Sequence, residues 1–116
     1  MKAFSLHLTS DSLEDAGGLR RAVVDGEKMT LTRYEFQAGA SFPQHRHDEE
    51  QLTLCLSGRL DFTVDGEEHR LTEGGILVIP GGSSHGAVAG EHGAEVVCVV
   101  TPKRSGTDSM EILEKA

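Results

Sequence analysis

The chain has 116 residues, enough for one compact domain and too few for two of ordinary size. It is 37% hydrophobic and 26% charged, and 11 Lys and Arg stand against 19 Asp and Glu, a formal charge of −8. A surface this acidic repels phosphate groups, so we expect neither nucleic acid nor an anionic membrane as a partner.

The N-terminal segment, residues 1–12, has one basic residue and no long apolar run, so it lacks the features of a secretory signal peptide. No apolar stretch of the sequence approaches the length of a membrane span. Cys55 and Cys98 both lie in apolar segments and are expected to be buried thiols, with a single disulfide as the alternative. These features predict a cytoplasmic protein.

The first predicted element is a short helix over residues 10–18, with Ser10 as a possible N-terminal cap. Residues 21–36 then alternate around Asp25-Gly26, a pair typical of a β-hairpin turn. The next apolar run, QLTLCL at 51–56, predicts a strand.

A second hairpin is predicted over residues 59–71, with Asp65-Gly66 at its tip. Two nearly continuous apolar runs at 76–80 and 94–100 predict buried strands, and residues 108–116 have the pattern of a short helix. Eight or more short strands at this spacing indicate an all-β sandwich or barrel.

Two histidines stand before the 51–56 strand, in HRHDEEQ. Alternate residues of a strand face the same side, so His45 and His47 should point together. Gln51 shares their parity if the intervening residues stay roughly extended. Glu50 is the rival oxygen ligand, since a bulge at 48–49 would turn its carboxylate inward instead.

A third histidine follows the predicted strand at 76–80. Pro80 stiffens and two glycines loosen the turn that leads to His85, so the chain can return across a barrel and aim this side chain inward. We therefore predict a metal site formed by His45, His47, Gln51 and His85.

These two segments resemble the two sequence motifs of the cupin superfamily. The Gly, His-x-His, Glu and Gly of the first motif correspond to Gly39, His45, His47, Gln51 and Gly58, with glutamine where glutamate is usual. The Gly, Pro-x-Gly and His of the second motif correspond to Gly74, Pro80, Gly82 and His85. The second motif departs from the pattern at Gly75, where Asp is frequent, and at Ala89, where Asn is usual.

The resemblance implies a cupin-type double-stranded β-helix, a jelly-roll barrel, in a single domain over residues 1–116. Its core would span 28–102, preceded by an N-terminal region, 1–27, and followed by a short tail, 103–116. It also implies a divalent ion (Zn, Ni, Mn or Fe) and a homodimer joined through the sheets. Tyr34, Phe36, Phe42, Thr53 and Cys98 are candidates to line the pocket.

Within cupins, this ligand pattern looks like that of two groups, the pectin-degradation type and the polyketide-cyclase type. The first group ends a late strand with an Asp and an Arg implicated in catalysis. Here Arg104 fits, but Cys98 replaces the Asp. Arg104 is a candidate to pair with a substrate carboxylate, and the alternative is a solvated surface arginine.

Three imidazoles and an amide leave the full charge of a divalent ion uncompensated, which favours polarisation of a bound carbonyl. The sequence thus predicts an isomerase, lyase or cyclase acting on a small oxygen-rich carbonyl or carboxylate compound. The alternatives are an Fe(II)-dependent dioxygenase and a metal- or small-molecule-binding module without turnover.

Overall fold

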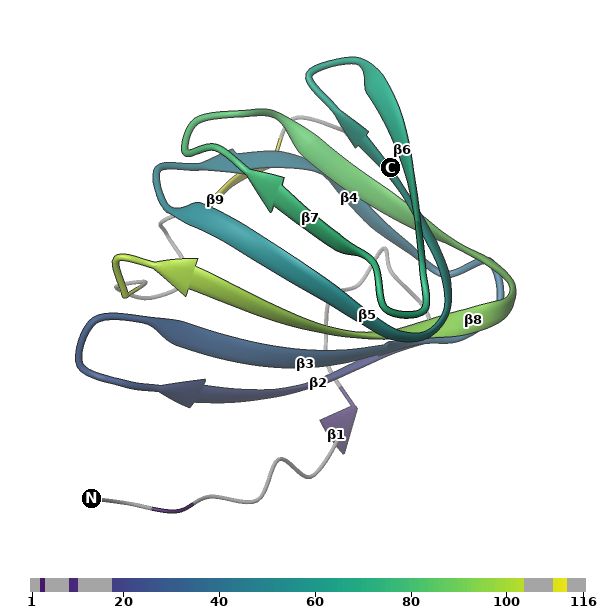
Figure 1. Cartoon of the computed structure of the whole chain (residues 1–116), viewed down its shortest axis with the longest axis horizontal. Coiled ribbons are helices and arrows are strands. Elements are labelled where there is room, and N and C mark those ends of the chain that lie inside the picture. The colour runs from purple at the N-terminus through teal and green to yellow at the C-terminus, as the bar shows by residue number, and fades with distance from the viewer. Residues whose placement is uncertain (1–2, 4–8, 11–17, 104–109, 113–116) are drawn as a thin grey trace.

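A computed structural model of the chain describes residues 3, 9–10, 18–103 and 110–112 (Figure 1). The described strands are β1 (Thr9–Ser10), β2 (Leu19–Asp25), β3 (Thr30–Phe36), β4 (Ser41–His47), β5 (Glu50–Val64), β6 (Glu67–Thr72), β7 (Ile76–Ile79), β8 (His85–Thr101) and β9 (Met110–Ile112). All neighbouring strands pair antiparallel. In this part of the chain, no helix is long and apolar enough to cross a membrane.

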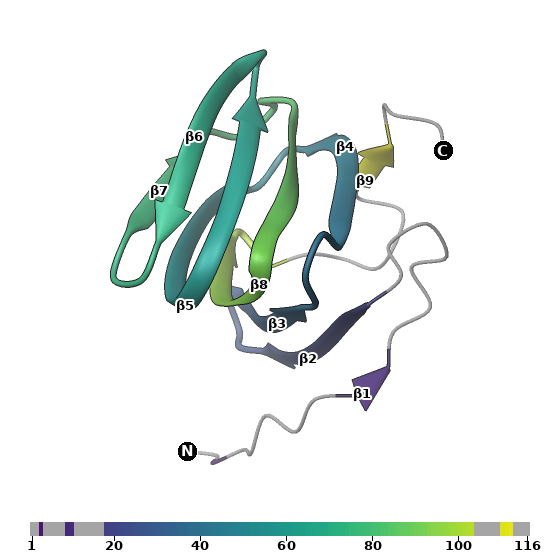
Figure 2. The ribbon, with the colours of Figure 1, turned by 90° about the vertical axis from the view of Figure 1, so that its right-hand side faces the viewer.

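The two long strands, β5 and β8, pair with each other along most of their length and belong to two layers. One layer has the order β1-β2-β3-β8-β5-β7 and uses the first half of β5 with the second half of β8. The other has the order β9-β4-β8-β5-β6 and uses the opposite halves. Figure 2 shows β2 and β3 on one side and β4 and β9 on the other, with β8 running between them.

The long strands cross between layers at two glycines. Gly58 on β5 and Gly93 on β8 have φ of 75° and 74°, a conformation that side-chain-bearing residues rarely adopt. A side chain on Gly58 would collide with the Gly93 carbonyl oxygen, and one on Gly93 with the Phe36 carbonyl oxygen. The register of β5 against β8 also shifts on both sides of Gly58. These features let both strands bend while their backbones remain in close contact.

The core lies between the two layers. Buried and partly buried residues alternate strictly along β3, as expected for a strand with one face toward a core. Cys55, Leu60 and Val96, each 1% exposed, come from the two long strands, and Ile79 from β7 is fully buried. The all-β architecture predicted from the sequence is therefore confirmed for the described residues.

Both predicted hairpins are present. Asp65 and Gly66 form a two-residue turn between β5 and β6, with φ of 47° and 82°, as a type I′ turn requires. The predicted strand at 51–56 and the first strand of the 59–71 hairpin are one continuous element, β5. Both cysteines are buried and free, as expected.

The prediction of a C-terminal helix over 108–116 is wrong where the structure describes it. Met110–Ile112 is strand β9, because the edge of β4 offers it backbone hydrogen-bonding groups. Ser10, the predicted helix cap, belongs to β1 and pairs with Arg20. The rest of that predicted helix, residues 11–17, lies outside the described residues.

Candidate metal centre

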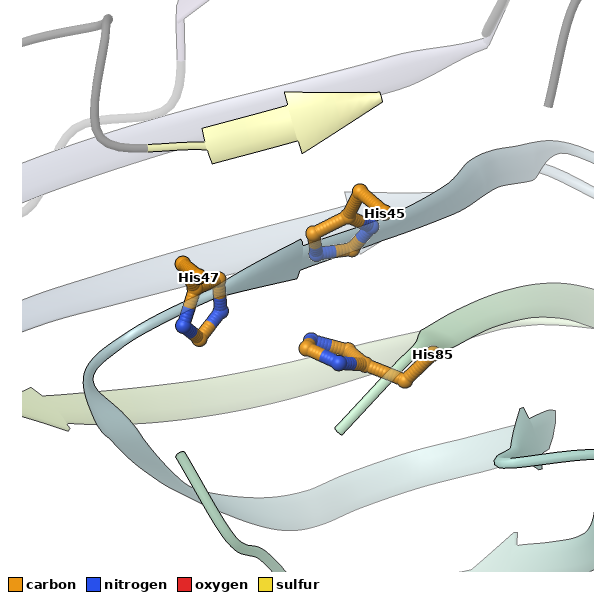
Figure 3. A group of neighbouring side chains, drawn as sticks. All are labelled: His45, His47 and His85. Carbon is orange, nitrogen blue, oxygen red and sulfur yellow. The ribbon is translucent and has the colours of Figure 1, made fainter. Parts of the chain in front are cut away.

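Three histidine rings meet between the layers (Figure 3). His45 and His47 are alternate residues of β4, and His85 is the first residue of β8 and the cross-strand partner of His45. Their exposed fractions are 6%, 4% and 2%. One nitrogen from each ring lies within 4.8 Å of the other two, a spacing at which all three could bind one metal ion.

Backbone carbonyls fix the proton of each ring. The Nδ1 atoms of His45, His47 and His85 lie 2.7, 3.1 and 2.9 Å from the carbonyl oxygens of Pro43, Glu49 and Ser83 respectively. A carbonyl oxygen can only accept, so Nδ1 is the donor in each pair. The neutral ring then keeps its lone pair on Nε2, the atom that faces the centre of the cluster.

The amide of Gln51 completes the cluster from β5. Its Oε1 lies 3.1 Å from Nε2 of His47 and 3.3 Å from Nε2 of His85, while its Nε2 donates to Thr53 Oγ1 at 3.0 Å. Ligand atoms each about 2.1 Å from one ion would lie roughly 3 Å apart. Four lone pairs thus converge with no donor among them, so these residues fit a divalent cation.

Burial also favours the neutral form of the His85 ring, which is the form that binds metals. Desolvation lowers the pKa of His85 and the neighbouring His47 lowers it further, whereas the Ser83 carbonyl and Asp65 act in the opposite direction. The net lowering of the pKa keeps the His85 ring neutral at pH 7. A neutral ring binds a metal without first losing a proton.

The turn after β7 holds His85 in place. The Gly82 amide donates to the His47 carbonyl oxygen at 2.8 Å, and the space beside Gly81 is filled by the Asp48 carbonyl. This turn therefore packs on the end of β4 and begins β8 beside the two β4 histidines. The inward aim expected for His85 from the Pro80 turn agrees with this geometry.

The sequence prediction assumed an extended chain through residues 48–50, but β4 ends at His47 and β5 begins at Glu50. The chain bends at Asp48 and Glu49, so Gln51 reaches the cluster from β5 and not from the strand that carries the histidines. Glu50, the rival ligand, is exposed. Glu49 is only 8% exposed, with Oε1 3.7 Å from His47 Nδ1. Nothing in the sequence of the acidic run 48–50 indicates that Glu49 is its buried member.

A cavity that opens to solvent adjoins the four side chains. Its aromatic walls are Tyr34, Phe36, Phe42 and Phe62, and its aliphatic walls are Leu60, Ala87, Val96 and Val100. Among the described residues that line it, none is Lys, Arg, Asp or Glu.

Of the residues expected to line the pocket, Thr53 alone does not; it is fully buried behind Gln51. Leu60 and Phe62 were missed because the sequence prediction assigned them to a separate hairpin. Cys98 lines the cavity, and burial raises the pKa of its thiol to about 11, so it is no substitute for an ionised Asp. Arg104 lies outside the described residues.

Comparisons with known proteins agree with this geometry. A family model described as the cupin domain matches residues 32–101. Dimethylsulfoniopropionate lyase DddW from Ruegeria pomeroyi is 40% identical over 65 residues, 56% of this chain and 43% of the lyase. The chain thus matches less than half of that relative's length.

Two solved structures are similar over most of the chain. KdgF from Halomonas sp. has a TM-score of 0.76 and 27% identity, covering 85% of this chain and 88% of its own. The polyketide cyclase RemF from Streptomyces resistomycificus has a TM-score of 0.83 and 20% identity, covering 100% and 87%, and at that identity it shows the fold alone. With a family model matching more than half of its residues and this fold, the chain belongs to the cupin family.

Proposed function

We propose that the chain binds one divalent metal ion through Nε2 of His45, His47 and His85 and Oε1 of Gln51. The observation that supports this most directly is the convergence of four lone-pair donors with no proton donor among them. In the absence of a cation, the lone pairs of these buried atoms repel one another.

The four side chains have distinct parts in this proposal. The three imidazoles are held by backbone carbonyls, which fix their orientation and strengthen them as ligands. All four donors are neutral, so the ion, whether Zn, Ni, Mn or Fe, keeps its full charge for Lewis-acid polarisation of a bound oxygen. The substrate would be a small carbonyl or carboxylate compound.

The rest of the site supports a role in binding or catalysis over a purely structural one. The cavity adjoins the four donor atoms and opens to solvent, so a small molecule could reach an ion bound there. Its apolar walls exclude water and strengthen electrostatic interactions within it. An isomerase, lyase or cyclase reaction fits this arrangement, and the similarity to a lyase supports that class. We further propose that Arg104 pairs with a substrate carboxylate.

Metal content of purified variants tests the ligand set. We expect one equivalent of metal in the parent protein, and a loss of affinity of roughly tenfold or more in His85→Ala and Gln51→Ala, measured by elemental analysis and chelator competition. Glu50→Ala is the matched control, because this carboxylate is adjacent in sequence and points away. Loss of metal from Glu50→Ala with full loading of Gln51→Ala would show that the ligand assignment is wrong.

A further inference from the structure

We infer that the molecule bound in this cavity has an aromatic or similarly flat, apolar body with oxygen donors at one end, and is not a polyhydroxylated sugar acid. This inference rests on the proposed metal centre, which would bind the oxygen donors. It concerns the opposite, protein-lined part of the cavity, where the walls consist of aromatic and aliphatic side chains.

The aromatic residues of the chain are concentrated around this cavity. The sequence has four Phe, one Tyr and no Trp. Apart from Phe4, which lies outside the described residues, every one of them lines the cavity. The rest of the described core is built from Leu, Ile, Val, Ala and Cys. The chain therefore uses its few aromatic side chains where a ligand would contact them.

Three of these aromatic side chains, those of Tyr34, Phe36 and Phe42, form a connected wall that reaches the metal site. The rings of Tyr34 and Phe42 lie 6.0 Å apart at 82°, and those of Tyr34 and Phe36 lie 6.0 Å apart at 49°. Phe42 in turn lies 4.7 Å from the ring of His45. Such tilted and edge-on arrangements suit a further aromatic ring, because ring edges and faces attract one another. A flat ligand could thus contact this wall while its oxygens reach the histidines.

The walls offer a sugar few hydrogen-bond partners. Outside the four proposed ligands, the polar side-chain groups that line the cavity are those of Thr32, Tyr34 and Cys98. A ring of hydroxyl groups entering here would lose water without replacing most of its hydrogen bonds. The cavity therefore selects against the sugar part of a uronic acid.

Two hydroxamates test this inference, because they share one chelating group and differ in body. Acetohydroxamate and benzohydroxamate, with galacturonate as the sugar acid, would each be titrated calorimetrically into Zn(II)-loaded protein. We expect benzohydroxamate to bind at least tenfold more tightly than acetohydroxamate, and galacturonate to bind most weakly. Phe42→Ala and Phe62→Leu should reduce the preference for benzohydroxamate and leave Zn(II) stoichiometry unchanged. Val88→Ala, on the exposed face of β8, is the control.

The possible outcomes separate the two proposals. Equal affinities of the hydroxamates, or tighter binding of galacturonate, would overturn the inference and leave the metal centre standing. If the loaded protein bound neither hydroxamate, the metal would have no accessible position, and the proposed function itself would fail. An undiminished preference for benzohydroxamate in both Phe variants would also overturn the inference, because the aromatic wall would then have no part in it.

Discussion

Thr53 holds the amide of Gln51 in one of its two orientations. Its Oγ1 accepts from Gln51 Nε2 at 3.0 Å, which turns Gln51 Oε1 toward the histidines. Thr53 is fully buried, and its hydroxyl also lies 3.3 Å from Cys98 Sγ. Backbone carbonyls orient the three rings, whereas a side chain orients the amide. A single substitution can therefore loosen the fourth ligand without touching the other three.

We predict that Thr53→Val weakens metal binding by roughly tenfold or more, since valine has the same shape but accepts no hydrogen bond. Thr53→Ser, which keeps the hydroxyl, should retain most of the affinity. Competition with a chromophoric chelator measures both, and urea unfolding of the metal-free proteins controls for lost stability. If the valine and serine variants bound metal equally well, Thr53 would have no positioning role.

Strand parity predicted which side chains of the cluster face inward, but not the path of the chain between them. His45 and His47 point inward as alternation along β4 requires, whereas Gln51 points inward from β5, after the bend. Glu49 is buried because the connection between β4 and β5 is only two residues long, so the chain turns there and one of its carboxylates faces inward. A run of three acidic residues shows no alternation of polar and apolar side chains, so the burial of Glu49 could not be inferred from it.

At the scale of elements, the backbone conformation of the turn between β5 and β6 restricts which residue can replace Gly66. Gly66 has φ of 82°, and a Cβ built there would meet no atom within 4 Å. A side chain at this position would thus be opposed by backbone conformation and not by crowding. Gly26, in the other predicted hairpin, lacks a positive φ and would make only ordinary contacts with Met29.

We therefore predict that Gly66→Ala lowers the free energy of unfolding by about 1 kcal/mol. Gly26→Ala is the control and should change it by no more than a few tenths of a kcal/mol, because alanine fits its backbone conformation. Urea unfolding followed by circular dichroism measures both. Equal effects of the two substitutions would contradict the backbone explanation.

Local features were easier to predict from the sequence than features that depend on contacts between residues far apart in the chain. The Asp-Gly pairs identified both hairpins, because that signal is local. The bend at Gly58 made β5 look like two strands, since its partner glycine, Gly93, is far away in sequence. Met110–Ile112 was assigned to a helix because so few residues cannot separate a period of 3.6 from one of 2, and pairing with β4 decides the outcome.

On the scale of the whole molecule, one outer face is unusually apolar. Leu52, Ile76 and Val78 are 40%, 59% and 54% exposed on neighbouring strands β5 and β7, with Leu52 paired to Val78. Val99 of β8, on the other side of Leu52, extends the same row. An apolar patch that continues across strands is uncommon on a monomer and typical of an interface. We propose that the homodimer expected from the sequence resemblance forms through this face.

Val78→Glu should then shift the protein from dimer to monomer, because two carboxylates would be buried against apolar side chains in the interface. Size-exclusion chromatography with light scattering measures the mass directly. Val88→Glu is the matched control, because Val88 is 51% exposed but lies on β8 where that strand belongs to the other layer. Metal content should be the same in both variants, since neither side chain lines the cavity. A parent protein that is already monomeric would show that the molecule has no such interface. A Val78→Glu variant that remains dimeric would show that the interface lies elsewhere. In either case, the apolar row would need another partner.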